Sequence, residues 1–376
     1  MGSKRTMLSN GLGAVLNREL TSASRFVDLF SGSGAVSLFV AQKKSIPVHA
    51  IDTQCYGPVL VRAVIGRDRP FRWRFSWDTW LERAKTERKA YRILDSAKIT
   101  RTTIRIIRRR CETARGPITR AYGGHYFSPN QASWLDALRF TAPKRAPARN
   151  IALAALIHAA SQCAAAPGHT AQPFQPTRRA KKFLHEAWSR DVVAKTKQAF
   201  AYLAKLHAIQ RGSVAVGDAN RAAKTLKKGD LVFIDPPYSA VHYSRFYHVL
   251  ETIARGRCGE VSGTGRYPPV RERPWSRYSV SSEAPKALEE LFRTVSSREV
   301  RTILTFPAHR CSNGLSGRTV RNLAKKYFHI DEQKVKSRLS SLGGAGKNGQ
   351  GAASRAARMR AKELILVLTP RNSRER

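Results

Sequence analysis

Acidic residues are scarce in this chain of 376 residues. Asp and Glu together number 26, whereas Lys and Arg number 68, which gives a formal net charge of +42. So large an excess of positive charge favours a polyanionic partner, either nucleic acid or an anionic membrane surface. The sequence offers no basic amphipathic helix with a convincing insertion face, which argues against the membrane surface. We therefore expect a nucleic acid as the partner.

Cysteine pairs, histidine arrays and long apolar runs are also lacking. The five cysteines include no Cys-x-x-Cys pair, and the ten histidines form no His-Glu-x-x-His array. These absences argue against a zinc site or a disulfide framework and favour the reducing cytoplasm. The sequence contains no run of about 18 apolar residues, so we expect no membrane-spanning helix. The first residues also lack the apolar core of a signal peptide. We expect a cytoplasmic protein without a bound metal, built from two or three structural units.

What the chain does contain is a short apolar strand that ends in an unusual turn. Residues 231–234 are Leu-Val-Phe-Ile, and Asp235-Pro236-Pro237-Tyr238 follow. Each proline ring fixes its own backbone angle, and Pro237 forces Pro236 into an extended conformation. The turn forms a stiff rim at the carboxyl end of a strand, where open α/β sheets bind ligands. Asp235 and the Pro236 carbonyl can accept the two hydrogens of an exocyclic amine, while Tyr238 stacks on a planar ring. The alternative is an ordinary Pro-Pro turn in which Asp235 caps a helix.

A second motif lies far upstream, where a strand runs through a glycine loop into a helix. Gly32 and Gly34 let the loop turn tightly and approach a ligand, and N–H groups at the start of the helix face the gap. The next strand, 46–52, ends in Asp52, about twenty residues beyond the loop, where an acid can hydrogen-bond ribose hydroxyls. Together the two features indicate an adenosine-type cofactor. Two purely structural strand ends remain the alternative.

From about Trp73 to Gln210 the chain reads as helical, basic and rich in aromatic residues. Within it, a helix over 101–110 brings four arginines close to one face while Ile104 and Ile107 pack elsewhere. A charged helix face is usually only solvated. Here no acid follows until Glu112, so we expect contacts with phosphates. The four residues are Arg101, Arg105, Arg108 and Arg109.

Two other segments are candidates for contacts with nucleic acid. The irregular loop 167–174 carries His169 and Gln172, whose polar side chains could read base edges. The segment 239–251 directly follows the proline turn and mixes aromatic with cationic residues, which suits stacking combined with phosphate contacts. We assign His242, Tyr243 and Arg245 to this role.

The remaining elements complete an α/β pattern. A helix is expected over 9–20 with Ser9 as its cap, and a strand over 213–218 ends in Asp218. Toward the C-terminus we expect a strand over 302–306 and a closing pair of strands over 328–336 and 363–368. The segments 256–283 and 343–362 are expected to be mobile loops, because Gly, Ala, Arg, Pro and Ser dominate them.

With these motifs in place, the chain resembles the amino-group DNA methyltransferases, and most closely the adenine-N6 group with the DNA adenine methylase layout. Asp235-Pro236-Pro237-Tyr238 matches the family's catalytic tetrad residue by residue, and 28–34 resembles its S-adenosylmethionine loop. Gly2-Ser3-Lys4-Arg5 with Met7-Leu8 resembles the family's opening motif. The order of opening motif, glycine loop, first acid, helical insert, second acid and tetrad also fits. The resemblance implies a Rossmann-like sheet with a mainly helical inserted domain. Its domain limits would be 1–55 and 211–376 for the catalytic part and 56–210 for the target-recognition insert.

The resemblance also assigns residues to the cofactor. The lysine of the opening motif would contact the methionine end of S-adenosylmethionine, Asp52 the ribose hydroxyls, and Asp218 would lie near the adenine amine. The full set implied by the resemblance is Lys4, Asp28, Phe30, Ser31, Gly32, Gly34, Asp52 and Asp218.

The reaction implied is transfer of a methyl group to adenine N6 of a base flipped out of double-stranded DNA. Three alternatives stay open: transfer to cytosine N4, action on RNA, or a basic nucleic-acid-binding protein whose catalytic core has decayed. A restriction or phage-defence nuclease is a possible partner.

Overall fold

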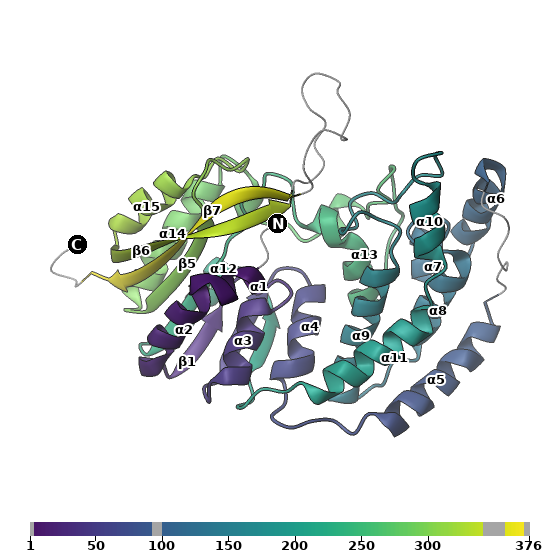
Figure 1. The fold of residues 1–376 in the computed structure, drawn as a ribbon, viewed down its shortest axis with the longest axis horizontal. Helices are drawn as coiled ribbons and strands as arrows, with labels where there is room; N and C mark the ends of the chain where they lie inside the picture. The colour runs from purple at the N-terminus through teal and green to yellow at the C-terminus, as the bar shows by residue number, and fades with distance from the viewer. Residues whose placement is uncertain (1–3, 92–99, 341–357, 372–376) are drawn as a thin grey trace, which may run out of the picture. The chain divides into compact units, whose positions relative to one another are not determined.

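A computed structural model describes residues 4–91, 100–340 and 358–371 (Figure 1). The chain divides into two compact units. The first unit consists of 1–53, 212–241 and 276–376, and the second of 54–211 and 242–275. Compared with the limits expected from the sequence, the second unit also takes 242–275, the stretch that directly follows the proline turn.

The first unit is built on a sheet that contains seven strands in the described residues, in the order β3-β2-β1-β4-β5-β7-β6. Strands β1 to β5 pair in parallel, whereas β7 is antiparallel to both β5 and β6. The strands are β1 (Arg25–Asp28), β2 (Val48–Asp52), β3 (Ser213–Val216), β4 (Asp230–Ile234), β5 (Arg301–Pro307), β6 (Phe328–Ser340) and β7 (Arg358–Pro370).

Strand β4 is the centre of this sheet. All five of its residues are buried, as expected for a strand with parallel neighbours on both sides, since such strands have both faces covered by helices. From β1 the chain order runs outward through β2 and β3, and from β4 it runs the other way through β5. The junction of β1 and β4 is therefore the topological switch point, and the carboxyl ends of these two strands form the expected ligand-binding crevice.

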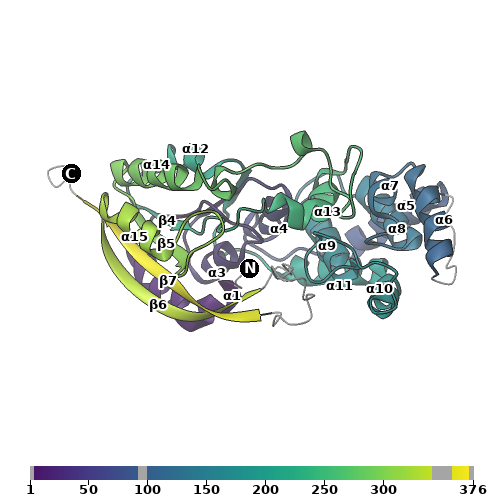
Figure 2. The same cartoon turned by 90° about the horizontal axis from the view of Figure 1, so that it is seen from above.

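Helices cover both faces of the sheet (Figure 2). One layer contains α12, α14 and α15, and its core includes Leu288 and Phe292 of α14 packed with Val232 and Ile234 of β4. Helices α1, α2 and α3 lie on the other side. The bounds are α1 (Lys4–Met7), α2 (Gly13–Glu19), α3 (Ala35–Lys43), α12 (Ala219–Ala223), α14 (Ala284–Ser297) and α15 (Gly317–Lys325), with the short helical turns η1 (Leu8–Leu12), η2 (Leu20–Ser22) and η4 (Arg277–Ser279).

The second unit is helical. Alanine-rich α9 lies at its centre, with most of its side chains buried, and packs against α4, α8, α11 and α13. Its helices are α4 (Tyr56–Ile65), α5 (Arg74–Lys89), α6 (Arg101–Glu112), α7 (Pro117–Tyr122), α8 (Pro129–Phe140), α9 (Ala148–Cys163), α10 (Lys181–Trp188), α11 (Val192–Lys205), α13 (Ser244–Arg255) and the turn η3 (Val270–Glu272).

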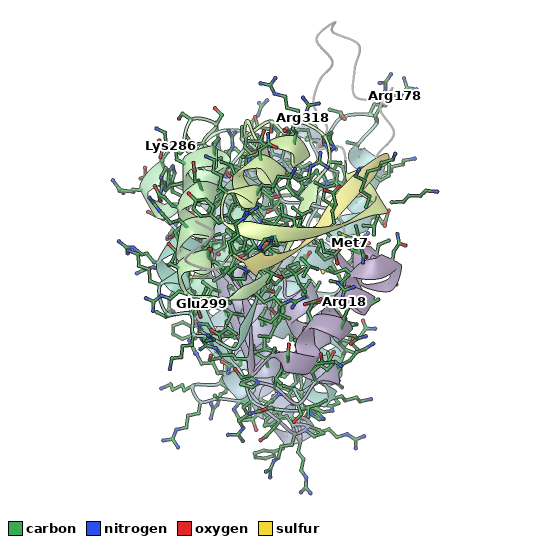
Figure 3. All side chains as sticks on the ribbon, turned by 90° about the vertical axis from the view of Figure 1, so that its left-hand side faces the viewer. Met7, Arg18, Arg178, Lys286, Glu299 and Arg318 are labelled. Carbon is green, nitrogen blue, oxygen red and sulfur yellow. The ribbon has the colours of Figure 1, made fainter. Side chains whose placement is uncertain are left out.

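The surface of the first unit carries many long basic side chains. Figure 3 shows Arg18 on α2, Lys286 on α14 and Arg318 on α15 among the side chains that project from the ribbon. Arg18 and Lys286 are 52% and 70% exposed. The positive charge of the sequence is thus carried on the surface, as solvation of cations requires.

Three local expectations from the sequence are wrong: the cap of the first helix, the exposure of the loop 256–283, and the start of the last strand. Ser9 is not a helix cap, because the helical segment already begins at Lys4 and is interrupted at Asn10 and Gly11 by non-helical backbone angles. Part of the loop 256–283 is packed in the core, since Tyr278 is only 2% exposed.

The last strand, β7, begins at Arg358 and not at Glu363. Pairing with β6 continues over 13 residues and so extends into sequence that lacks apolar alternation. Residues 343–357 of the expected mobile segment lie outside the described residues. Among the described residues, no helix is long and apolar enough to cross a membrane.

Candidate active site

The glycine loop connects β1 to α3 at the switch point. Gly32 and Gly34 adopt positive φ angles of 49° and 86°, a backbone region that costs a side-chain-bearing residue energy but glycine little. Gly34 occupies the N-cap position of α3, and its N–H donates to the Ser31 carbonyl at 2.7 Å. The loop is therefore a tight turn that only glycines at these two positions form without strain.

Asp28 supports the loop from behind. It is 1% exposed, the Ser37 hydroxyl donates to its Oδ2 at 2.6 Å, and the Phe30 N–H donates to its Oδ1 at 3.3 Å. Burial raises the pKa of the Asp28 carboxyl to about 7, although the hydrogen bond from Ser37 opposes the shift. Asp28 thus holds the backbone of the loop, and its effect on a ligand would pass through that backbone.

Asp52 is tied to the same loop. The N–H of Gly32 donates to its Oδ2 at 2.8 Å, and the N–H of Ser31 donates to the carbonyl of Ile51 at 2.9 Å. The carboxyl end of β2 and the glycine loop are therefore one rigid structure. Asp52, the acid expected to bind ribose hydroxyls, lies beside the loop, in agreement with its position about twenty residues further along the chain.

Two features of the loop point to a ligand. A Cβ atom added at Gly32 would meet no atom within 4 Å, so the space beside it is open. The hydroxyl of Ser31 is buried but has no hydrogen-bonding partner among the described residues. Because a buried polar atom without a partner is costly, an open space next to such an atom fits a polar ligand.

The proline turn begins where β4 ends. The Asp235 side chain is 23% exposed, and its Oδ1 receives two bonds: one from the Lys4 ammonium at 2.9 Å and one from the Thr305 hydroxyl at 2.8 Å. The same Lys4 ammonium contacts Glu363 Oε2 at 3.0 Å. Lys4 of α1 and Thr305 of β5 thus hold this carboxylate directly, and Glu363 of β7 holds Lys4.

The cluster contains one cation and two anions, and their charges shift the pKa values of Asp235 and Lys4. Burial raises the pKa of Asp235, the positive charge of Lys4 opposes the shift, and the negative charge of Glu363 adds to it. Burial alone would lower the pKa of Lys4, but Asp235 and Glu363 outweigh it and raise that pKa.

Some hydrogen-bond acceptors of the proline turn receive a hydrogen bond in the described residues and others do not. The Pro237 carbonyl accepts from the Asn313 side-chain amide at 2.9 Å. In the part of the chain that the structure describes, no group donates to Asp235 Oδ2 or to the Pro236 carbonyl. These are the two acceptors that the sequence predicts for an exocyclic amine.

Aromatic rings line the same region of the first unit. Tyr238 is partly buried against the core, as is Phe30, and the ring of Phe30 lies edge-on to Tyr278 with centroids 5.0 Å apart. Asp218 caps α12 by accepting the Arg221 N–H at 3.0 Å.

Four residues of the site were missed in the sequence: Ser37, Thr305, Asn313 and Glu363. Thr305 and Asn313 carry no recognisable pattern, because each acts through a contact with a distant segment. Ser37 lies nine residues from Asp28 in the same strand-loop-helix motif, so its signal was local. Glu363 carries a weak signal. A single acid precedes the apolar run 364–368, and buried acids are rare unless paired.

The arginines expected on one helix face of the second unit lie on α6. Arg105 and Arg109 are exposed, whereas Ile104 and Ile107 are buried, as expected. Arg108 is only partly exposed, and its Nε donates to the Gly124 carbonyl at 2.9 Å, so this nitrogen has a structural role. The side chain of Arg101 lies outside the described residues.

The other candidate contacts also belong to the second unit. His169 is partly buried with its ring 5.3 Å from that of Phe246, and Gln172 is exposed. The guanidinium of Arg245 lies 4.7 Å above the ring of Tyr267. His242 lies against Trp275, whose side chain is 59% exposed. Tyr243 is partly buried and contacts Phe246 edge-on.

A sheet with this strand order, a glycine loop after β1 and an acid-proline-proline-tyrosine turn after β4 define an α/β protein with a candidate ligand site at the switch point of the sheet. The family model of D12 class N6 adenine-specific DNA methyltransferases matches residues 1–305, and the chain belongs to this family. The match covers both the glycine loop and the proline turn, the two motifs on which the resemblance rests.

A curated relative supports the same class over a shorter stretch. The modification methylase LlaI of Lactococcus lactis subsp. lactis is 42% identical over 84 residues, which are 22% of this chain and 13% of that protein. The match therefore spans a small part of the length of this relative.

The buried carboxyl of Asp28 predicts a pH effect on stability. Its pKa of about 7 in the folded protein exceeds the ordinary value of about 3.9 in an unfolded chain. The stability that it contributes is complete below pH ~4 and is lost as the pH rises toward 7. Asp28→Asn should remove this loss, so thermal unfolding between pH 5 and 8 should show a smaller decrease for the variant than for the wild type.

The control is Asp331→Asn, which changes an exposed carboxyl on β6. Its unfolding temperature should follow the wild type at each pH. Parallel curves for Asp28→Asn and the wild type would contradict the assignment of a raised pKa to Asp28.

Proposed function

We propose that this protein transfers a methyl group from S-adenosylmethionine to N6 of an adenine flipped out of double-stranded DNA. The observation that carries the proposal is the arrangement of Asp235. Its Oδ1 is held by Lys4 and Thr305, so the carboxylate is fixed in orientation and Oδ2 is left for a substrate.

The residues of the glycine loop fit the proposed cofactor. The open space at Gly32 and the unpartnered hydroxyl of Ser31 suit a polar ligand that lies against the loop, and Asp52 beside them suits ribose hydroxyls. S-adenosylmethionine would supply a methyl group activated on a sulfonium. Lys4 has three N–H donors, of which Asp235 and Glu363 use two, so one remains for the methionine end. The other proposed cofactor residues are Asp28, Phe30, Gly34 and Asp218.

Asp235 and Pro236 would prepare the amine for reaction. The N6 lone pair of adenine is delocalised into the ring and is a poor nucleophile. Hydrogen bonds from its two hydrogens to Asp235 Oδ2 and the Pro236 carbonyl would draw the nitrogen toward a tetrahedral shape and localise that pair. Correct position then matters more than acid–base strength, and the negative charge of Asp235 stabilises the positive charge that develops on N6.

The base must leave the duplex before it reaches Asp235. Flipping costs a few kcal/mol in lost stacking and pairing, and stacking on Tyr238 would offset part of this cost. Pro237 contributes by fixing the turn, because its ring restricts the backbone and its carbonyl is anchored by Asn313.

The helical second unit is the proposed DNA-binding part. Exposed Arg105 and Arg109 are proposed to contact phosphates, with Arg101 and the outer nitrogens of Arg108 in the same role. For contacts with bases and flanking phosphates we propose His169, Gln172, His242, Tyr243 and Arg245. Phosphate contacts of this kind make affinity depend steeply on salt.

Two further proposals concern the setting of the enzyme. The name of the matched relative, a modification methylase, supports a cognate restriction or phage-defence nuclease as the partner. The cytoplasm remains the expected compartment, since the five cysteines are free thiols.

Asp235→Ala should abolish methyl transfer and leave DNA affinity nearly unchanged, because the substitution removes an acceptor of the amine and no proposed phosphate contact. The measurement is modified-base sequencing of DNA from cells that express either protein. Wild type should yield N6-methyladenine within one sequence motif, and the variant none. Asp331→Ala serves as the control and should methylate normally. Full methylation by Asp235→Ala would refute the role of this carboxylate, and methylcytosine in the wild-type sample would refute the proposed substrate.

Ser31→Ala tests the proposed cofactor loop. Removing an unpartnered buried hydroxyl should leave the unfolding temperature of the free protein unchanged or slightly higher, because no hydrogen bond within the protein is lost. Binding of S-adenosylmethionine, measured by calorimetry, should weaken by roughly 5-fold to 10-fold, the value of one net hydrogen bond. Unchanged affinity would mean that the loop does not contact the cofactor through Ser31.

Arg105 and Arg109 should each contribute to the electrostatic part of DNA binding. Replacing both by Ala should reduce the slope of log K against log salt by about 2, since each phosphate contact contributes about 0.9. The matched control is Lys228→Ala in the first unit, where the lysine pairs with Glu299 at 2.8 Å and should leave the slope unchanged. An equal slope for the double variant and the wild type would remove α6 from the DNA interface.

A further inference from the structure

Glu363 is a buried acid with no role in the reaction outlined above. It is 1% exposed and lies on β7, opposite Pro307 of β5 and Val335 of β6. An ionised carboxylate at such a position is costly unless it is paired. It forms an ion pair with the Lys4 ammonium at 3.0 Å, and the same ammonium holds Asp235.

The geometry of the sheet brings Glu363 to the active site. On β5 and β7 the register pairs Pro307 with Glu363 and Thr305 with Ile365. Because side chains two residues apart point to the same face of a strand, Thr305 and Glu363 are diagonal neighbours on one face. Two adjacent strands thus present one group to Asp235 directly and another to the lysine that binds Asp235.

The charge near the accepting nitrogen depends on whether Glu363 is part of this cluster. With Lys4 alone beside it, Asp235 would form a neutral pair, and its field at a neighbouring nitrogen would be largely cancelled. Lys4, Asp235 and Glu363 together are two carboxylates and one ammonium, so these three groups have a formal charge of −1 when all are ionised. Methyl transfer places positive charge on the accepting nitrogen, and a site with net negative charge stabilises that charge.

We propose that Glu363 is a positioning residue for methyl transfer, which holds the Lys4 ammonium against Asp235 Oδ1 and keeps the site net negative where the accepting nitrogen becomes cationic. This inference rests on the proposed function and extends it to a residue outside the loop and the tetrad. A lysine that only bound cofactor would not need a second buried carboxylate.

The titration of Asp235 gives a readout that a purely structural role would not change. The charged groups that act on it are Lys4 from α1, Glu363 from β7 and Asp28 from β1. Glu363 raises the pKa of Asp235, so removing its charge lowers that pKa. Since Asp235 must be ionised to act, the acidic limb of the rate profile should then shift to lower pH.

The test compares the wild type with Glu363→Gln, which keeps the shape and one oxygen acceptor but removes the charge. Single-turnover methyl transfer to duplex DNA should slow on the order of 10-fold to 100-fold. This is less than the roughly 10²-fold to 10³-fold cost of removing a group that contacts the reacting atoms, because Glu363 acts through Lys4. The acidic limb should move to lower pH. Dissociation constants for S-adenosylmethionine and for DNA, measured by calorimetry and fluorescence anisotropy, should each stay within about 3-fold, because neither ligand loses a direct contact.

Asp230→Asn is the matched control. Asp230 is also a buried carboxyl of the sheet, paired with Arg25, but it lies at the opposite end of β4 from Asp235. This variant should unfold at a lower temperature and still transfer methyl groups at the wild-type rate and pH dependence. A slower rate in Asp230→Asn equal to that of Glu363→Gln would mean that any buried charge loss has this effect, and would overturn the inference.

Glu363→Asp keeps the charge on a shorter side chain and should give a rate between those of the wild type and Glu363→Gln. If Glu363→Gln does not fold, Glu363→Asp decides alone, because a carboxylate one methylene shorter cannot keep the 3.0 Å contact with Lys4. It should then be several-fold slower than wild type with unchanged binding constants.

Besides an equally slow Asp230→Asn, three results would overturn the inference: a wild-type rate and acidic limb in Glu363→Gln, a wild-type rate in Glu363→Asp, or an affinity for S-adenosylmethionine that falls as much as the rate. Absence of methyl transfer by the wild type would instead refute the proposed function, so the two failures are distinguishable.

Discussion

The structure of the site depends on one ammonium group shared between two carboxylates. Lys4 joins α1 to β4 and β7 through contacts of 2.9 and 3.0 Å, and both acids are largely shielded from water. Removing one partner of a buried ion pair leaves an uncompensated charge that costs about 3–5 kcal/mol. The beginning of the chain, the central strand and the last strand are therefore held together at the point where chemistry is expected.

This constraint limits the movement of the Asp235 carboxylate. Thr305 and Lys4 occupy the same oxygen of the carboxylate, and the rigid proline turn prevents the backbone from adjusting. The carboxylate is oriented before any substrate binds, so little reorganisation is needed during reaction. Such preorganisation is the main source of electrostatic stabilisation in enzymes.

The two units of the chain differ in the physical requirements of their proposed roles. The first unit needs a low-dielectric crevice with fixed dipoles, and it achieves this with a sheet covered by helices on both faces. The second unit is proposed to attract a polyanion. Its helix α6 exposes Arg105 and Arg109 on one face, while Ile104 and Ile107 on the other face are buried. Extreme basicity is compatible with a stable core because the cations stay in water.

Some features could be read from the sequence because they depend on local order. The buried strand before Asp235 and the glycine loop with Gly32 and Gly34 each follow from neighbouring residues. The family match to residues 1–305 agrees with the class predicted from these motifs. Local patterns determine strands, turns and caps because the forces behind them act within a few residues.

The partners of those motifs were decided only by tertiary structure. Lys4 and Glu363 are 359 positions apart, and Thr305 and Asp235 are 70 apart, so no local pattern connects them. The sheet brings them together through the antiparallel register of β5 and β7, which depends on packing of the whole first unit. The sequence alone thus determined which groups are available for the reaction, whereas the fold decided which oxygen of Asp235 is held and which is left for the substrate.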